Sequence, residues 1–169
     1  MRILIVEDAP TQQLLLTEMV RAVFNGDAQE IVCAGTLKES QEIVAGRRMS
    51  LAIVDLQLAD ADPHKTIAEF PFGEIPTIVL TAMTDPRFGF WALNKGAMYY
   101  FRKPIQKEDW NDFGATAANA VRNHALQVSH TRLCKAVEKI NALDNDLKKV
   151  VEVIKTEGVS GCQGAKPTS

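Results

Sequence analysis

Five short runs of apolar residues recur along this 169-residue chain, and they limit the possible fold more than any other feature. Each run is of strand length and nearly continuous, which is typical of strands covered on both faces of a parallel sheet. Helical patterns separate the runs, at residues 11–24, 36–46, 64–70 (a short one between two prolines) and 85–97. The runs themselves are ILIV (3–6), IVCAG (31–35), LAIV (51–54), TIVL (77–80) and MYYF (98–101). This alternation predicts an α/β fold with helices on both faces of a doubly wound parallel sheet.

The character of the sequence changes after the fifth run. No proline occurs from Lys107 to Glu157, and the residues beyond are rich in Gly, Ser and Pro. These shifts predict three parts, which are an α/β domain over residues 1–120, a helical coiled-coil segment over 121–157 and a flexible tail over 158–169.

The predicted helical segment repeats apolar residues every seven positions. One column is Leu126, Leu133, Ile140, Leu147 and Ile154, and the column four residues further on is His130, Val137, Asp144, Val151 and Gly158. Such spacing is typical of a coiled coil, in which Asp144 would weaken the seam and set its register. The covering partner could be a second copy, another protein's helix or the same chain folded back. We predict a homodimer and leave the orientation of its helices open.

Charge and composition exclude several classes of function. The net charge is −2, and residues 107–169 carry nine Lys/Arg against eight Asp/Glu, so no basic surface for DNA is expected. No apolar stretch reaches the roughly 18 residues that a membrane span needs, and a cytoplasmic protein is expected. Cys33, Cys134 and Cys162 lack C-x-x-C spacing, which predicts neither a disulfide framework nor a zinc site.

Polar residues follow four of the five predicted strands. Glu7 and Asp8 come after the first strand, Asp55 after the third, Thr81 after the fourth and Lys103 after the fifth. Ligands of open parallel sheets bind at the carboxyl ends of the strands, where the strand order reverses. If the first and third strands flank that point, three carboxylates converge, and a cation is needed to offset their repulsion. Oxygen ligands of this kind suit Mg²⁺.

This set of side chains is suited to phosphoryl transfer. An ionised Asp55 is a competent nucleophile for a phosphoryl group and would form an acyl phosphate. Mg²⁺ and the Lys103 ammonium would offset charge on the phosphoryl oxygens, and the Thr81 hydroxyl would donate a hydrogen bond to them.

Four segments together resemble the receiver domain of two-component response regulators. They are ILIVEDAP, LAIVDLQL, TIVLTA and GAMYYFRKPI, spread over residues 1 to about 120. The resemblance implies a flavodoxin-like (βα)5 fold with strand order 2-1-3-4-5 and a cis bond between Lys103 and Pro104.

The same resemblance implies a signalling switch that is not an enzyme, beyond catalysing its own phosphorylation and dephosphorylation. Asp55 would be phosphorylated by a histidine kinase or a phosphotransfer protein. The other implied roles are Mg²⁺ binding by Glu7, Asp8, Asp55 and the backbone carbonyl of Gln57, phosphoryl contacts by Thr81 and Lys103, and a switch shared by Thr81 and Tyr100.

The chain departs from the family pattern after the phosphoacceptor position. The family often has proline four residues beyond it and glycine four further on, where this chain has Ala59 and Pro63. We therefore expect a remodelled loop and third helix. Taken singly, Asp8 could cap the first helix and Tyr100 could be simple packing.

Other functions compete with the switch. An aspartyl-phosphate phosphatase generally needs D-x-D, whereas Pro10 and Gln57 stand two residues after Asp8 and Asp55. An FMN carrier needs a phosphate-binding loop, which EDAPTQQ does not supply. The pair Ser129–His130 loosely resembles a kinase phosphoacceptor helix but lacks the acid after the histidine. A receiver that is idle and serves as a dimerising scaffold also stays open.

Overall fold

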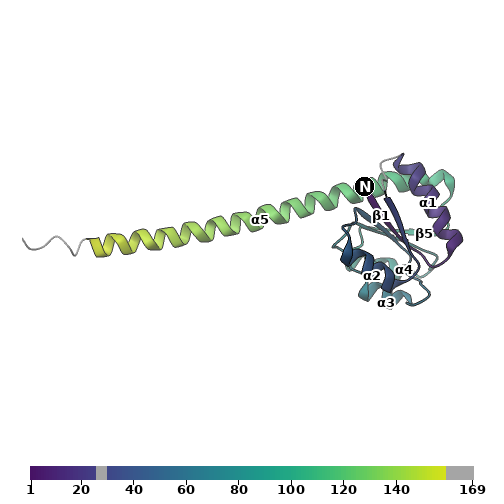
Figure 1. The fold of residues 1–169 in the computed structure, drawn as a ribbon, viewed down its shortest axis with the longest axis horizontal. Coiled ribbons are helices and arrows are strands. Elements are labelled where there is room, and N and C mark those ends of the chain that lie inside the picture. The colour runs from purple at the N-terminus through teal and green to yellow at the C-terminus, as the bar shows by residue number, and fades with distance from the viewer. Residues whose placement is uncertain (26–29, 159–169) are drawn as a thin grey trace, which may run out of the picture. The chain divides into compact units, whose positions relative to one another are not determined.

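The computed structural model describes residues 1–25 and 30–158, and it contains one five-stranded parallel sheet (Figure 1). The strand order is β2-β1-β3-β4-β5, which confirms the predicted flavodoxin-like topology. The predicted flexible tail, beyond its first residue, lies outside the described residues. The strands are β1 (Arg2–Val6), β2 (Glu30–Ala34), β3 (Leu51–Val54), β4 (Thr77–Thr81) and β5 (Tyr99–Arg102).

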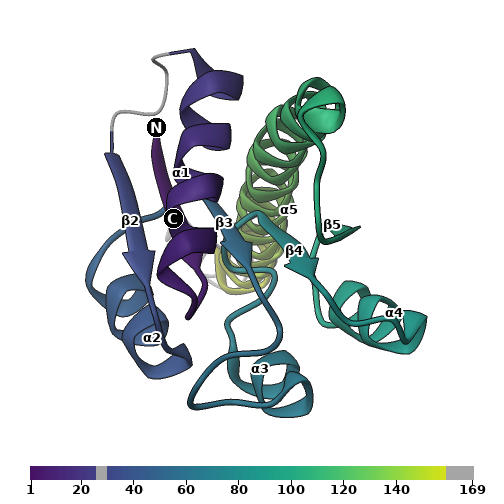
Figure 2. The same cartoon turned by 90° about the vertical axis from the view of Figure 1, so that its right-hand side faces the viewer.

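Helices cover both faces of the sheet, as the alternating pattern predicts (Figure 2). One face packs against α1 (Pro10–Phe24) and the first turns of α5 (Trp110–Gly158), with Met19, Val20 and Phe113 fully or almost fully buried there. The other face packs against α2 (Leu37–Gly46), α3 (Pro63–Glu69) and α4 (Pro86–Asn94). A short 3₁₀ helix, η1 (Lys107–Asp109), precedes α5.

The register of the central strands decides which residues meet at the carboxyl edge. Val6 at the end of β1 lies between Ala34 of β2 and Val54 of β3. The amide of Glu7 donates to the Ala34 carbonyl at 3.0 Å, and the amide of Asp55 donates to the Val6 carbonyl at 2.9 Å. Glu7 and Asp55 therefore leave neighbouring strands side by side.

The loop between β3 and α3 is tied to α2 by an aspartate. Asp60 accepts hydrogen bonds from the amides of Leu37, at 2.8 Å, and Lys38, at 3.2 Å, in the first turn of α2. Burial acts to raise the pKa of Asp60, but these amide bonds outweigh it and leave the pKa below 3.8. Asp62 then caps α3, a helix of seven residues, by accepting from the amide of Lys65 at 2.9 Å.

The chain divides into two compact units after Ala125. Phe113, Ala117 and Ala120 of α5 belong to the buried core of the first unit. The part of α5 from Leu126 onward, here called the α5 extension, has every described side chain from Ser129 to Lys155 exposed. The proposed boundary at residues 120/121 stays a prediction. Within the described residues, no helix has both the length and the apolar character that a membrane crossing needs.

Candidate functional site

A lysine and two carboxylates meet at the carboxyl edge of the sheet. The Lys103 ammonium donates to Asp55 Oδ2 at 2.5 Å and also to Glu7 Oε2. All three groups are largely removed from water, since Glu7 is 2% exposed, Asp55 is 7% exposed and the Lys103 side chain is 12% exposed. The structure therefore brings together three of the predicted site residues from three different strand ends.

Backbone groups fix both carboxylates in place. Asp55 Oδ1 accepts a hydrogen bond from the amide of Gln57 at 3.1 Å, and Glu7 Oε1 accepts one from the amide of Ala9 at 3.2 Å. The Gln13 side chain of α1 also donates to the Glu7 carbonyl at 2.5 Å. These contacts leave the acidic groups few alternative positions.

Burial and charge shift the pKa values of Glu7 and Lys103. Burial is the largest influence on Glu7 and raises its pKa above 4.5, although bonding to Lys103 acts in the opposite direction. Burial disfavours the charged form of Lys103, but hydrogen bonds to Asp55 and Glu7 outweigh it and raise the pKa above 10.5. The raised pKa of Glu7 indicates that burial disfavours its ionised form.

Asp8 differs from the other two predicted carboxylate ligands, Glu7 and Asp55, because its side chain is exposed. It does not cap α1 either, since Ala9 is the N-cap residue and no side chain caps that helix. Across residues 1–25 and 30–158, no three acidic, histidine or cysteine side chains form a ready cluster for a metal ion. The oxygen donors of Glu7 and Asp55 nevertheless have the chemistry that Mg²⁺ prefers.

Thr81 and Tyr100 are linked through the backbone of Met83. Thr81 is fully buried, and its hydroxyl accepts a hydrogen bond from the Met83 amide at 3.3 Å. The Tyr100 hydroxyl donates to the Met83 carbonyl, also at 3.3 Å. The amide of Lys103 donates to the Thr81 carbonyl at 2.9 Å, and the peptide bond between Lys103 and Pro104 is cis. The two predicted switch residues thus contact one residue of the loop between β4 and α4.

Gly89 of α4 was not singled out from the sequence, yet it sets the position of Tyr100. A Cβ atom on Gly89 would lie 2.9 Å from two atoms of the Tyr100 ring. Ordinary side chains do not tolerate that separation, so the ring packs against α4 only because residue 89 is glycine. Glycine inside a helix costs roughly 0.5–1 kcal/mol relative to alanine. In the sequence, the only signal for this role of Gly89 is a glycine in the middle of a helical pattern.

The strand order defines a doubly wound α/β domain, and at the carboxyl edge of its sheet a buried aspartate is paired with a lysine. The chain belongs to the response regulator receiver domain family, which matches residues 3–112. It is 29% identical over 134 residues to the KDP operon transcriptional regulatory protein KdpE of Escherichia coli, covering 79% of this chain and 56% of that protein. It is 32% identical over 123 residues to protein-glutamate methylesterase/protein-glutamine glutaminase 4 of Myxococcus xanthus, covering 68% of this chain and 33% of that protein. The chain thus spans a third to just over half of these two relatives.

Solved structures show the same fold. A response regulator receiver domain protein from Clostridium thermocellum superposes with a TM-score of 0.63 at 20% identity, covering 75% of this chain and 98% of that one. A CheY-like receiver domain protein from Methanospirillum hungatei superposes with a TM-score of 0.61 at 22% identity, covering 75% and 97%. These similarities concern the fold alone.

Replacing Glu7 by glutamine tests whether its buried charge lowers stability and contributes to Mg²⁺ binding. Because folding raises the pKa of Glu7, its ionised carboxylate lowers stability at neutral pH, and that cost fades as the pH falls towards 4.5. The glutamine amide carries no charge and is a weaker ligand for Mg²⁺. We expect Glu7→Gln to unfold at a higher temperature than the native protein in EDTA, and to gain much less stability from MgCl₂.

Glu42→Gln is the matched control, because Glu42 is an exposed glutamate on α2. It should respond to MgCl₂ as the native protein does. Equal stabilisation of Glu7→Gln and the native protein by MgCl₂ would show that Glu7 does not contribute to a metal site.

Proposed function

We propose that this receiver accepts a phosphoryl group on Asp55 from a histidine kinase or phosphotransfer protein, in a Mg²⁺-dependent reaction. The observation that carries the proposal is the buried Asp55 carboxylate held by the Lys103 ammonium at 2.5 Å. A buried carboxylate with a fixed cation is the arrangement that acyl phosphate formation needs. Membership of the receiver family supports the same assignment.

The reaction would use the chain's own groups in defined roles. An Asp55 carboxylate oxygen attacks phosphorus, the phosphorus–nitrogen bond of phosphohistidine breaks, and its electron pair returns to the imidazole. Lys103 then offsets the charge of the new phosphoryl oxygens, and the Thr81 hydroxyl donates to one of them. Bound Mg²⁺ would supply further positive charge, and Glu7, Asp8, Asp55 and the Gln57 carbonyl would hold it.

The response to phosphorylation would reach a second copy of the chain. We propose that Tyr100 and Thr81 shift together, and that the signal alters pairing between α5 extensions in a homodimer located in the cytoplasm. The exposed apolar columns of the extension support this, since a single helix leaves them in water. We propose no DNA contact and no turnover of other substrates, although the relatives named above carry transcriptional and methylesterase names.

The test is the molar mass in solution, measured by light scattering with and without beryllofluoride and MgCl₂. Beryllofluoride mimics a phosphoryl group on an aspartate. We expect a dimer whose dissociation constant changes when beryllofluoride and Mg²⁺ are both present, and not with either alone. An identical dissociation constant under all conditions would show that the state of the Asp55 site does not affect pairing of the α5 extensions. That result would favour the idle scaffold.

Adding a single methyl group to Gly89 should displace the Tyr100 ring. The added Cβ in Gly89→Ala would lie 2.9 Å from the ring, so the ring must move and the bond from its hydroxyl to Met83 is lost. The chain contains two tyrosines, so 3-fluorotyrosine gives two fluorine NMR signals, with Tyr99 as internal reference. We expect the Tyr100 signal to shift and to respond less to beryllofluoride.

Gly46→Ala provides the control. Gly46 also lies in a helix, and a Cβ there meets nothing within 4 Å. Its Tyr100 signal should match that of the native protein. An unshifted Tyr100 signal in Gly89→Ala would show that α4 does not hold this ring.

A further inference from the structure

The apolar face of the α5 extension is wider than the two columns that the heptad pattern defines. A third column, Ala136, Leu143 and Val150, lies one residue before Val137, Asp144 and Val151. Leu143 is 64% exposed and Val150 is 53% exposed in the single chain. The two apolar columns and the mixed column that contains Val137 and Val151 together form a face broader than the narrow seam of a simple coiled coil. Whatever covers this face must therefore contact all three columns.

Parallel pairing with a second copy fits this face poorly. In a parallel, in-register coiled coil each core residue faces its own counterpart, so Asp144 of one chain would face Asp144 of the other. Two carboxylates facing each other in an apolar seam repel and lose hydration. Lys148 would also flank Leu143 of the second copy, and Lys155 would flank Val150. The third apolar column would thus border charged side chains.

Antiparallel pairing centred on residue 142 reduces these conflicts, because the two Asp144 carboxylates no longer face each other. In that register each residue of one core column faces a residue of the other column. The facing pairs are Val137 with Leu147, Ile140 with Asp144, Val151 with Leu133, and His130 with Ile154. Every described residue of the column that contains Asp144 then has an apolar partner, and the two Asp144 carboxylates lie in neighbouring layers.

The flanking columns also match in the antiparallel register. On one side, Leu143 faces Leu143 of the second copy, and Ala136 faces Val150, so a small residue meets a larger one. On the other side, Lys148 faces Cys134 and Lys155 faces Gln127, so no two like charges meet. Lys148 stays free to keep its ion pair with Asp144 of the same chain, at 2.6 Å.

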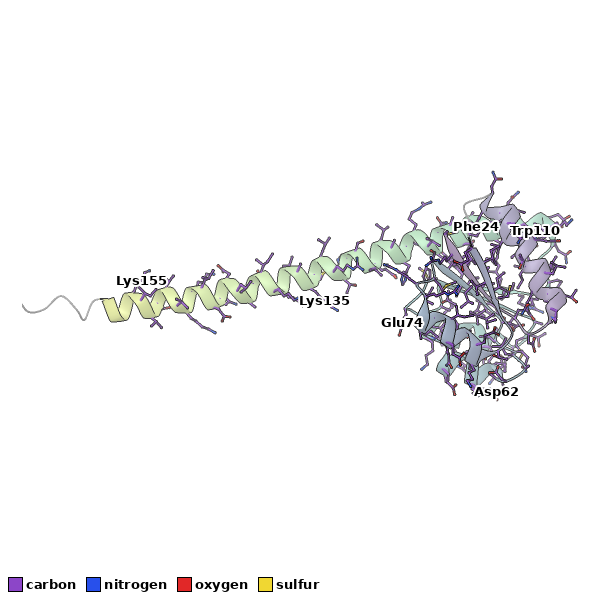
Figure 3. The ribbon with its side chains drawn as sticks, viewed as in Figure 1. Phe24, Asp62, Glu74, Trp110, Lys135 and Lys155 are labelled. Atoms are coloured by element: carbon purple, nitrogen blue, oxygen red, sulfur yellow. The ribbon has the colours of Figure 1, made fainter. Side chains whose placement is uncertain are left out.

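We infer that the α5 extension pairs with the extension of a second copy in antiparallel orientation, through all three columns within residues 130–154. The inference rests on the homodimer in the proposed function and adds its orientation and register. When a second copy of this segment runs in the opposite direction, its residues match those that they face. This match points to another copy of the chain as the partner. Figure 3 labels Lys135 and Lys155 on the extension, whose side chains project all around the helix.

Disulfide cross-linking of the full chain tests the orientation, using the exposed native Cys134 as one half of each link. The parent variant carries Cys162→Ser, since Cys162 lies outside the described residues. Lys148→Cys adds the antiparallel partner of Cys134, and Ser129→Cys adds its parallel partner. Residues 134 and 148 of one helix are about 21 Å apart, so any link between them joins two chains.

We expect Lys148→Cys to run as a disulfide-linked dimer after mild oxidation, while Ser129→Cys and the parent stay monomeric on a non-reducing gel. In the same register Asn141 faces itself, so Asn141→Cys in a Cys134→Ser, Cys162→Ser background should also cross-link. Cross-linking of Ser129→Cys alone would establish parallel pairing and overturn the inference. Failure of Lys148→Cys and Asn141→Cys to link would overturn it as well.

Phosphorylation of the same variants separates this inference from the proposed function. None of the changed residues lies at the Asp55 site, so each variant should still be labelled by acetyl phosphate. Labelled protein without the expected links would reject the antiparallel pairing and leave the phosphoacceptor role intact. Absence of labelling in the native protein would instead count against the phosphoacceptor role, whatever the gel shows.

Discussion

Asp55→Asn is expected to abolish labelling by acetyl phosphate, while the native chain acquires one phosphoryl group in the presence of MgCl₂. The amide oxygen of asparagine can still accept the Gln57 amide bond that Asp55 Oδ1 accepts at 3.1 Å, so the loop should keep its conformation. The amide is not an anionic nucleophile and cannot form the acyl phosphate. Intact-protein mass spectrometry measures the added group directly.

Asp62→Asn is the control for this substitution. Asp62 lies in the same loop and caps α3, and asparagine is as good a capping residue as aspartate. Its labelling should equal that of the native chain. Continued labelling of Asp55→Asn would place the phosphoacceptor elsewhere and contradict the proposed function.

Ile140→Asp is expected to dissociate the proposed homodimer. Ile140 is 64% exposed in the single chain and lies in the middle of the fully apolar column. Dimerisation would bury one carboxylate from each chain without an oppositely charged partner, which typically costs 3–5 kcal/mol. We therefore expect dimerisation to weaken by about 100-fold or more, since 1.4 kcal/mol corresponds to a factor of ten. Sedimentation equilibrium measures the dissociation constant.

Asn145→Asp adds the same charge outside the three columns and should leave dimerisation nearly unchanged. Circular dichroism of both variants checks that the helix is retained. If Ile140→Asp dimerised as tightly as the native protein, the apolar columns would not form the interface.

The order of the elements along the chain and the identity of the site residues could largely be predicted from the sequence, because both depend on local patterns. A buried parallel strand appears as a continuous apolar run, and its end is marked by the first polar residue. Glu7 and Asp55 were each found in this way, whereas Lys103 stands one residue beyond the first polar residue, Arg102. Family membership then supplied the strand order, which the periodicity alone does not contain.

Contacts between strand ends could not be predicted, because they depend on register and side-chain conformation. The sequence grouped Glu7, Asp8 and Asp55 as three equivalent carboxylates. The structure buries Glu7 and Asp55 against Lys103 and leaves Asp8 exposed. The dependence of Tyr100 on Gly89 was missed for the same reason, since it arises where α4 crosses β5.

By itself, the sequence determined the order of the elements and which polar residues lie at the carboxyl edge of the sheet. Both follow from hydrophobic periodicity along a single segment. Only the tertiary structure decided that the Lys103 ammonium joins Glu7 and Asp55, and that the Tyr100 ring rests on a glycine. Such contacts join residues that are far apart in the chain, and they form only when packing fixes the separation and orientation of the segments that carry them.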